Sequence, residues 1–145
     1  MKKLESSSSE QTKKFGIDFA KNISGRNLQR VGKEYATIIA LQGNLGAGKT
    51  TFTQGFAKGL GIKRRMMSPT FVLMRRFKNL YHIDAYRIKK IDSLEVLGLK
   101  EIFADPKNIV LVEWPENIKK ILPRGTIWLK FEYGKTENQR RIVIK

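Results

Sequence analysis

A glycine-rich segment between an apolar run and an amphipathic run constrains the fold of this chain more than any other feature. The segment Gly43–Thr50 reads Gly-Asn-Leu-Gly-Ala-Gly-Lys-Thr and fits the pattern G-x-x-x-x-G-K-[ST]. The run Ala36–Leu41 before it is almost entirely apolar, as in a buried strand. After it, Phe52, Phe56 and Leu60 recur at the spacing of one helix face. The order of strand, glycine-rich loop and helix predicts an α/β fold with a phosphate-binding loop.

The residue types of this segment suit the binding of a nucleoside triphosphate. Glycines let the backbone turn tightly and bring several N–H groups to one point, where the start of the following helix completes an anion site. Lys49 would reach the β- and γ-phosphates, and the hydroxyl of Thr50 would bind Mg²⁺. An ordinary glycine-rich turn does not explain why Lys and Thr occupy those two places. We therefore expect nucleotide contacts from the loop and the first helical residues: Leu45, Gly46, Ala47, Gly48, Lys49, Thr50 and Thr51.

Two carboxylates at the ends of apolar runs are candidates for the rest of the site. Glu113 follows Ile109–Val112, and Asp84 follows Leu80–Ile83. Because the carboxyl ends of parallel strands meet at one sheet edge, we expect either acid to lie beside the phosphate loop, where it could bind the metal. His82 shares a strand face with Asp84, so the two side chains could form a hydrogen-bonded pair. His82 could alternatively act as a general base, or only pack in the core.

Trp114 and Arg87 each leave alternatives open. Trp114 precedes Pro115, which biases it toward an extended conformation. Its ring could be an anchor in the core or at a rim, or it could shape the γ-phosphate pocket or a partner surface. Arg87 could neutralise charge in a transition state or form a surface salt bridge.

Charge and cysteine content bound the function further. Among 145 residues, 29 Lys and Arg stand against 13 Asp and Glu, a net charge of +16. This charge fits contact with nucleic acid or an acidic partner, and equally a surface of solvated lysines. The absence of Cys excludes disulfides and thiolate metal sites. No apolar run approaches the roughly 20 residues of a membrane helix, and the start lacks a secretory signal, so we expect a cytoplasmic protein.

The remaining patterns predict a flexible polar tail over residues 1–8 and one domain over residues 9–145. Apolar spacing predicts a helix from about Ser9 to Gly25, and a capping pattern starts another at Asp92, with Gly98 interrupting or ending it. The other expected elements are two strands, a short helix and a terminal hairpin, at Phe71–Phe77, Leu80–Ala85, Asn117–Leu122, and Thr126–Tyr133 with Arg141–Ile144.

Three further segments, taken with the loop, give the chain a resemblance to a known family. They are Ser-Pro-Thr-Phe at Ser68–Phe71, Tyr-His-Ile-Asp-Ala-Tyr-Arg at Tyr81–Arg87, and Val-Glu-Trp-Pro-Glu at Val112–Glu116. In their order and spacing, over about residues 12–143, the chain resembles TsaE, also called YjeE, the bacterial ATPase of the tRNA threonylcarbamoyladenosine pathway. The loop is shared by many families, whereas the combination of segments is much more specific.

The resemblance implies a three-layer P-loop fold with a mostly parallel central sheet, flanking helices and a C-terminal β-hairpin. It implies weak hydrolysis of ATP to ADP with Mg²⁺, and a complex with TsaD and TsaB. Those proteins transfer threonylcarbamoyl to adenosine 37 of tRNAs that read codons beginning with A. Turnover of ATP would drive or reset their complex. The tRNA would be reached through that complex, and the positive charge leaves direct contact open.

The resemblance also implies roles for individual residues. The metal ligands would be Thr50 and Glu113. Nucleotide contacts outside the loop would come from Thr12 and Arg140, and Ser68–Thr70 falls at a switch-like segment. With the chemistry of the loop, the catalytic set becomes Lys49, Asp84, Glu113 and Trp114.

Two other functions use the same loop. A small-molecule kinase is one alternative, although the chain shows no obvious lid over an acceptor pocket. A nucleotide-gated binding module is the other, with ATP controlling its docking and turnover incidental.

Overall fold

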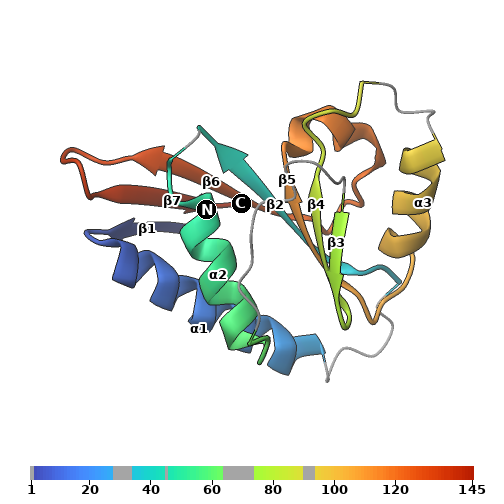
Figure 1. Ribbon diagram of the computed structural model, residues 1–145, viewed down its shortest axis with the longest axis horizontal. Helices are drawn as coiled ribbons and strands as arrows, with labels where there is room; N and C mark the ends of the chain where they lie inside the picture. The colour runs from blue at the N-terminus through green and yellow to red at the C-terminus, as the bar shows by residue number, and fades with distance from the viewer. Residues whose placement is uncertain (1, 28–33, 45, 64–73, 90–93) are drawn as a thin grey trace. The chain divides into compact units, whose positions relative to one another are not determined.

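The structure, a computed structural model, describes residues 2–27, 34–44, 46–63, 74–89 and 94–145, with the side chains of 25–27 and 94–97 excepted (Figure 1). These residues belong to two compact units. Unit 1 comprises Met1–Val31, Gly43–Ser68 and Leu129–Lys145, and unit 2 comprises Gly32–Gln42 and Pro69–Trp128. None of the helices in these described ranges combines the length and apolar character needed to cross a bilayer.

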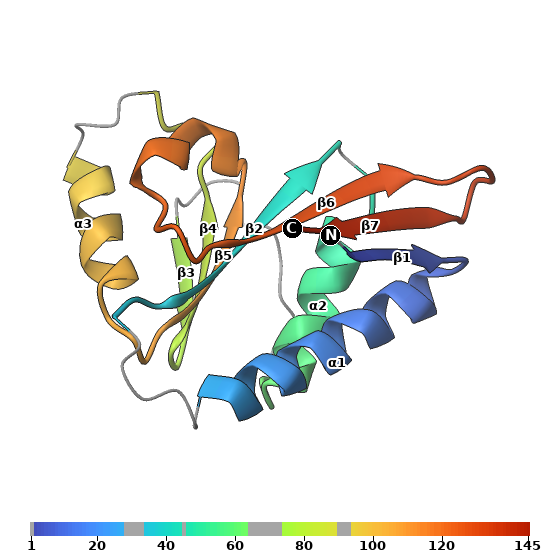
Figure 2. The same ribbon diagram turned by 180° about the vertical axis from the view of Figure 1, so that it is seen from behind.

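Unit 1 packs two helices against antiparallel strands. The strands are β1 (Lys2–Ser6), β7 (Arg140–Ile144) and most of β6 (Ile127–Tyr133), with β7 between the other two. Both of its neighbours pair with β7 in the antiparallel sense. The helices α1 (Ser9–Asn27) and α2 (Lys49–Gly59) pack against each other and lie on one side of these strands (Figures 1 and 2).

Aromatic rings and glycines hold the two helices together. The rings stack with centroids 5.5–6.4 Å apart and come from both helices and β6: Phe15, Phe19, Phe52, Phe56 and Phe131. The backbones meet where side chains are absent. A Cβ at Gly55 would overlap the carbonyl oxygen of Lys13, and one at Gly59 would lie 2.5 Å from the oxygen of Ile17. The close crossing of α1 and α2 therefore depends on glycine.

The amino terminus differs from the expected flexible tail over residues 1–8. Lys2–Ser6 form β1, in which Lys2 lies opposite Ile144 and Ser6 lies opposite Arg140. The polar side chains gave no sequence signal for this strand. The strand is held by backbone hydrogen bonds to β7 rather than by an apolar face. The expected helix after the tail is found, and α1 continues past Gly25 to Asn27.

Unit 2 has a parallel centre. The strands lie in the order β2 (Thr37–Gly43, whose last residue belongs to unit 1), β5 (Ile109–Glu113), β4 (Leu80–Asp84) and β3 (Met74–Phe77). The pairs β2–β5 and β4–β5 are parallel, whereas β3–β4 is antiparallel. Every residue of β5 is buried, which explains its continuous apolar run.

Two helical elements contribute to the core of unit 2. They are α3 (Leu94–Phe103) and the 3-10 helix η1 (Pro115–Ile121). Buried apolar residues from these elements and from the strands form one cluster: Ala36, Ile38, Tyr81, Ile83, Ala85, Ile88, Leu99, Phe103, Val110, Val112 and Ile118. The cluster fixes β4 beside β5, and with it the ends of both strands.

Other sequence predictions are refined by these elements. The chain is a mixed α/β protein, but parallel pairing is seen in β2, β5 and β4, while β3, β6, β7 and β1 pair antiparallel, so the sheet is less parallel than predicted. Gly98 does not end a helix, since α3 continues to Phe103. One glycine costs a helix about 1 kcal/mol, which tertiary packing can offset. The start of the predicted strand at Phe71 and the predicted helix cap at Asp92 lie outside the described residues.

Candidate functional site

The glycine-rich segment has the backbone conformation that its glycines predict. The φ angles are 143° at Gly43, 80° at Gly46 and 105° at Gly48, all values that side chains disfavour. A Cβ at Gly43 would lie 2.6 Å from the backbone oxygen of Phe131 in β6. Gly48 caps α2 from a left-handed conformation and, among the described residues, no side chain caps this end. Leu45 lies outside the described residues.

Lys49 is the first residue of α2 and is only 9% exposed. A positive charge at a helix amino terminus opposes the helix dipole, and burial of an ammonium group costs further free energy. The first turn of α2 carries no acidic residue to offset this charge. The start of α2 is thus a place where Lys49 could contribute to holding an anion. The next residue, Thr50, is exposed, and Thr51 is partly buried.

Thr12 and Arg140 lie beside this loop within unit 1. A Cβ at Gly48 would lie 3.6 Å from Cγ2 of Thr12 and 3.8 Å from Cγ of Arg140. Arg140 Nη2 donates a hydrogen bond of 3.2 Å to the carbonyl oxygen of Gly46. The family resemblance rests on only short matching segments around Thr12 and Arg140, yet the structure brings both side chains to the same loop.

Tyr133 also borders the loop, and sequence reasoning missed it. The guanidinium of Arg140 lies 5.0 Å from the centre of the Tyr133 ring. The Tyr133 hydroxyl would lie 3.2 Å from a Cβ at Gly46. The available signal was the pairing of the last two strands, in which Tyr133 stands opposite Arg140.

The two candidate acids are neighbours at the ends of parallel strands in unit 2. Asp84 ends β4, Glu113 ends β5, and the two are register partners, as their positions after apolar runs predicted. Glu113 is buried, whereas Asp84 is partly exposed and accepts a 2.9 Å hydrogen bond from the backbone N–H of Tyr86. Glu113 is also the register partner of Leu41, two residues before Gly43 on β2.

His82 pairs with Glu113 rather than with Asp84, which corrects the predicted pair. The distance from Nε2 of His82 to Oε2 of Glu113 is 3.0 Å, and both side chains are buried. In the register of β4 with β5, His82 lies opposite Leu111, so Glu113 is its diagonal neighbour, at a separation of about 7–8 Å that long side chains can span. An ionised carboxylate only accepts, so Nε2–H donates. His82 Nδ1 is buried and has no hydrogen-bond partner within the described part of the chain.

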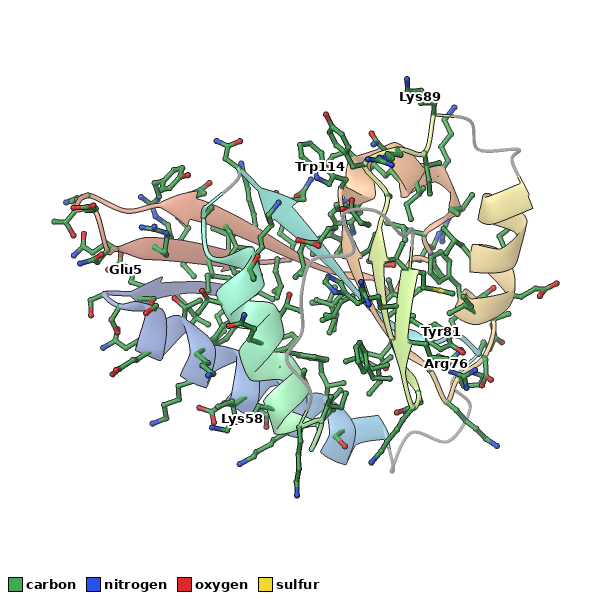
Figure 3. The ribbon with its side chains drawn as sticks, viewed as in Figure 1. Glu5, Lys58, Arg76, Tyr81, Lys89 and Trp114 are labelled. Carbon is green, nitrogen blue, oxygen red and sulfur yellow. The ribbon has the colours of Figure 1, made fainter. Side chains whose placement is uncertain are left out.

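Trp114 does not take the extended conformation that Pro115 favours. Its φ is 55° and its ψ is 47°, a left-handed conformation at the start of η1. Such a conformation costs a residue with a side chain roughly 1–2 kcal/mol. Trp114 is 42% exposed (Figure 3). Its ring lies 5.0 Å from that of Tyr86, which is 60% exposed. Trp114 is therefore not a core anchor. Arg87 is exposed nearby in sequence, and its role stays a prediction.

The donor set suits a divalent cation shared with a nucleotide. Within the described ranges, no group of three His, Cys, Asp or Glu side chains could hold a metal alone. The oxygens of Thr50 and Glu113 are the hard donors that Mg²⁺ prefers, and Mg²⁺ commonly completes its shell with phosphate oxygens and water. By its donor chemistry, each of these two oxygens fits Mg²⁺ that is bound together with a nucleotide. The segment Ser68–Thr70 lies outside the described residues.

These features define a mixed α/β protein with a glycine-rich loop between a strand and a helix. Residues 6–142 match the family model described as "Threonylcarbamoyl adenosine biosynthesis protein TsaE". The chain therefore belongs to the TsaE family.

Similar proteins come from several bacteria. The tRNA threonylcarbamoyladenosine biosynthesis protein TsaE of Bacillus subtilis is 47% identical over 91 residues, which cover 60% of this chain and 56% of the relative. The protein of that name from Haemophilus influenzae is 36% identical over 124 residues, or 83% of this chain and 75% of the relative. The crystal structure of Bacillus subtilis YdiB superposes with a TM-score of 0.75 at 31% identity, covering 99% of this chain and 83% of that one. The sequence match thus spans little more than half of the first relative.

Proposed function

We propose that this chain is a weak Mg²⁺-dependent ATPase required to form the threonylcarbamoyl group on adenosine 37 of tRNAs that read codons beginning with A. Membership of the TsaE family and the names of its relatives support the pathway. The observation that carries the nucleotide part is Lys49, buried in the first turn of α2 after glycines with positive φ. A lysine at the start of a helix, after a loop with N–H groups turned to one point, is well placed to bind an anionic ligand such as a phosphate.

The residues of the chain divide the work of binding and hydrolysis. Loop amides and Lys49 bear the charge of the phosphates. Thr50 and Glu113 hold Mg²⁺, directly or through water, and His82 orients Glu113 through its Nε2–H. Bound Mg²⁺ would neutralise charge on the β- and γ-phosphates. Asp84 orients or activates the attacking water.

The strand β2 both pairs with the strand of Glu113 and leads into the loop. Leu41 pairs with Glu113, and the same strand continues to Gly43, where the loop begins. Asp84 follows on the neighbouring strand as the register partner of Glu113. We infer one domain over residues 9–145 in which both sets act on one nucleotide.

TsaD and TsaB are the proposed partners. Turnover of ATP drives or resets their complex in the cytoplasm, and tRNA is reached through it. Hydrolysis by the chain alone is slow, in keeping with the weak ATPase activity that the family resemblance implies. Trp114, which is exposed and follows Glu113 in sequence, shapes the γ-phosphate pocket or meets the partner.

Reconstitution with TsaD and TsaB over several turnovers tests this function. Lys49→Ala should abolish ADP binding by calorimetry and stimulation of threonylcarbamoyladenosine synthesis. Lys58→Ala is the matched control, because Lys58 is an exposed lysine of the same helix, and it should behave as the wild type. If the wild type binds neither ADP nor ATP with Mg²⁺, the proposal is wrong.

Product analysis separates the alternatives. Release of inorganic phosphate indicates hydrolysis, whereas a phosphorylated metabolite indicates a kinase. Asp84→Asn should stop turnover but leave nucleotide binding in place. If synthesis is still stimulated by this variant without hydrolysis, the chain is a nucleotide-gated binding module.

A further inference from the structure

Ser6 joins the first strand of unit 1 to the first helix. It is 6% exposed, and its hydroxyl lies 2.7 Å from the hydroxyl of Thr12. The same Ser6 hydroxyl donates a 2.7 Å hydrogen bond to the carbonyl oxygen of Ser8. A hydroxyl has one proton, so Thr12 donates to Ser6 when Ser6 donates to Ser8. This pair orients the polar side of Thr12 toward Ser6.

The methyl group of Thr12 faces the loop. Its Cγ2 would lie 3.6 Å from a Cβ at Gly48, and Thr12 is only 2% exposed. Rotation about χ1 of Thr12 would break the contact with Ser6 or the packing against Gly48. The Thr12 hydroxyl also lies 3.3 Å from the carbonyl oxygen of Ser8, so Ser6 and Ser8 together hold the Thr12 side chain beside the loop, with Ser6 at the shorter distance.

Ser6 also lies opposite Arg140, the other side chain beside the loop. In the register of β1 with β7 it is the partner of Arg140. Arg140 donates to the carbonyl oxygen of Gly46, and its other terminal nitrogen donates to the carbonyls of Glu137 at 2.7 Å and Gln139 at 2.8 Å. The strand β1 therefore borders both side chains that flank Gly46 and Gly48.

We propose that β1 is part of the nucleotide site and that Ser6 is a positioning residue for Thr12 and Arg140. This inference rests on the proposed nucleotide binding. A nucleotide that contacts Thr12 or Arg140 binds better when β1 is docked on β7. Because linkage is reciprocal, the nucleotide also stabilises the docked strand.

Two measurements test the linkage. Ser6→Ala should weaken binding of Mg²⁺-ADP in calorimetry by about tenfold, the change expected when one buried hydrogen bond is lost. Ser7→Ala is the matched control, because Ser7 is the adjacent, exposed serine whose hydroxyl bonds only Gln11 among the contacts described, and its affinity should equal that of the wild type. In the wild type, ADP should slow hydrogen exchange at the amides of residues 2–6 severalfold.

The outcomes separate this inference from the function on which it rests. If the wild type binds ADP but Ser6→Ala binds as tightly as Ser7→Ala, Ser6 does not position the site. If Ser6→Ala does not fold, exchange in the wild type decides, and equal rates at residues 2–6 with and without ADP overturn the linkage. If the wild type binds no nucleotide, the proposed function fails as well.

Discussion

Substitution of Gly55 by alanine should lower the stability of the fold, although alanine is the better helix former. Alanine in place of glycine stabilises a helix by about 1 kcal/mol. At Gly55, however, the added Cβ would overlap the carbonyl oxygen of Lys13 and lie 2.9 Å from its carbon and 3.1 Å from its Cα. All three are backbone atoms of α1, so no side-chain rotation relieves the overlap. The two helices must separate by about 1 Å in a core that is close-packed.

The magnitude follows from two costs. Overpacking typically costs about 1–3 kcal/mol. Separation of the helices also loosens ring pairs such as Phe15 with Phe52, at 5.6 Å, and such pairs contribute about 0.5–1.5 kcal/mol each. Less the gain in helix propensity, the expected loss is about 2 kcal/mol in the free energy of unfolding.

Urea denaturation followed by circular dichroism measures this loss. Gly98→Ala is the matched control, because Gly98 lies within α3, is exposed, and a Cβ there would meet nothing within 4 Å. It should raise the free energy of unfolding by about 0.5–1 kcal/mol. Opposite signs for the two variants are the expected result. A Gly55→Ala protein as stable as the wild type would refute the close crossing of α1 and α2.

Two further substitutions probe unit 2. His82→Ala should lower the free energy of unfolding by about 1–3 kcal/mol because it removes the buried donor to Glu113, and it should weaken Mn²⁺ binding to the ADP complex in electron paramagnetic resonance titrations. His82→Gln keeps an N–H donor and should recover part of the stability and part of the Mn²⁺ affinity. Equal behaviour of His82→Ala and His82→Gln would contradict a role of His82 in positioning Glu113. Lys78→Gly should raise the melting temperature, because Lys78 has a φ of 55° and glycine removes about 1 kcal/mol of strain. Lys135→Gly, at an exposed position without positive φ among the described residues, should not raise it, and a rise in both would point to a charge effect instead.

Local patterns predicted those parts of the site whose geometry is local. The positive φ values at Gly46 and Gly48 follow from a loop that must turn tightly before a helix. Asp84 and Glu113 follow from the rule that parallel strands end at one edge, and their register pairing agrees with it.

Features that depend on which strands meet could not be read from the sequence. The strand β1 could not be predicted from the sequence, because the strand with which it pairs, β7, lies far away along the chain. The contact of His82 with Glu113 could not be predicted either. A diagonal contact depends on the register between two strands, and the spacing of His82 and Asp84 along one strand contains no information about that register. Trp114 adopts a left-handed conformation against the bias of the following proline, so the local preference did not predict it.

The pairing of β1 with β7 also bears on how the protein reaches its native state. Lys2 meets Ile144, so this pairing closes a very long loop, whose entropic cost must be met before the contacts can form. Long-range pairing of this kind slows folding. During synthesis, β1 emerges from the ribosome without its neighbour and must wait until β7 follows. A truncated translation product would hence carry the loop glycines and Lys49 but lack the strand that completes their surroundings.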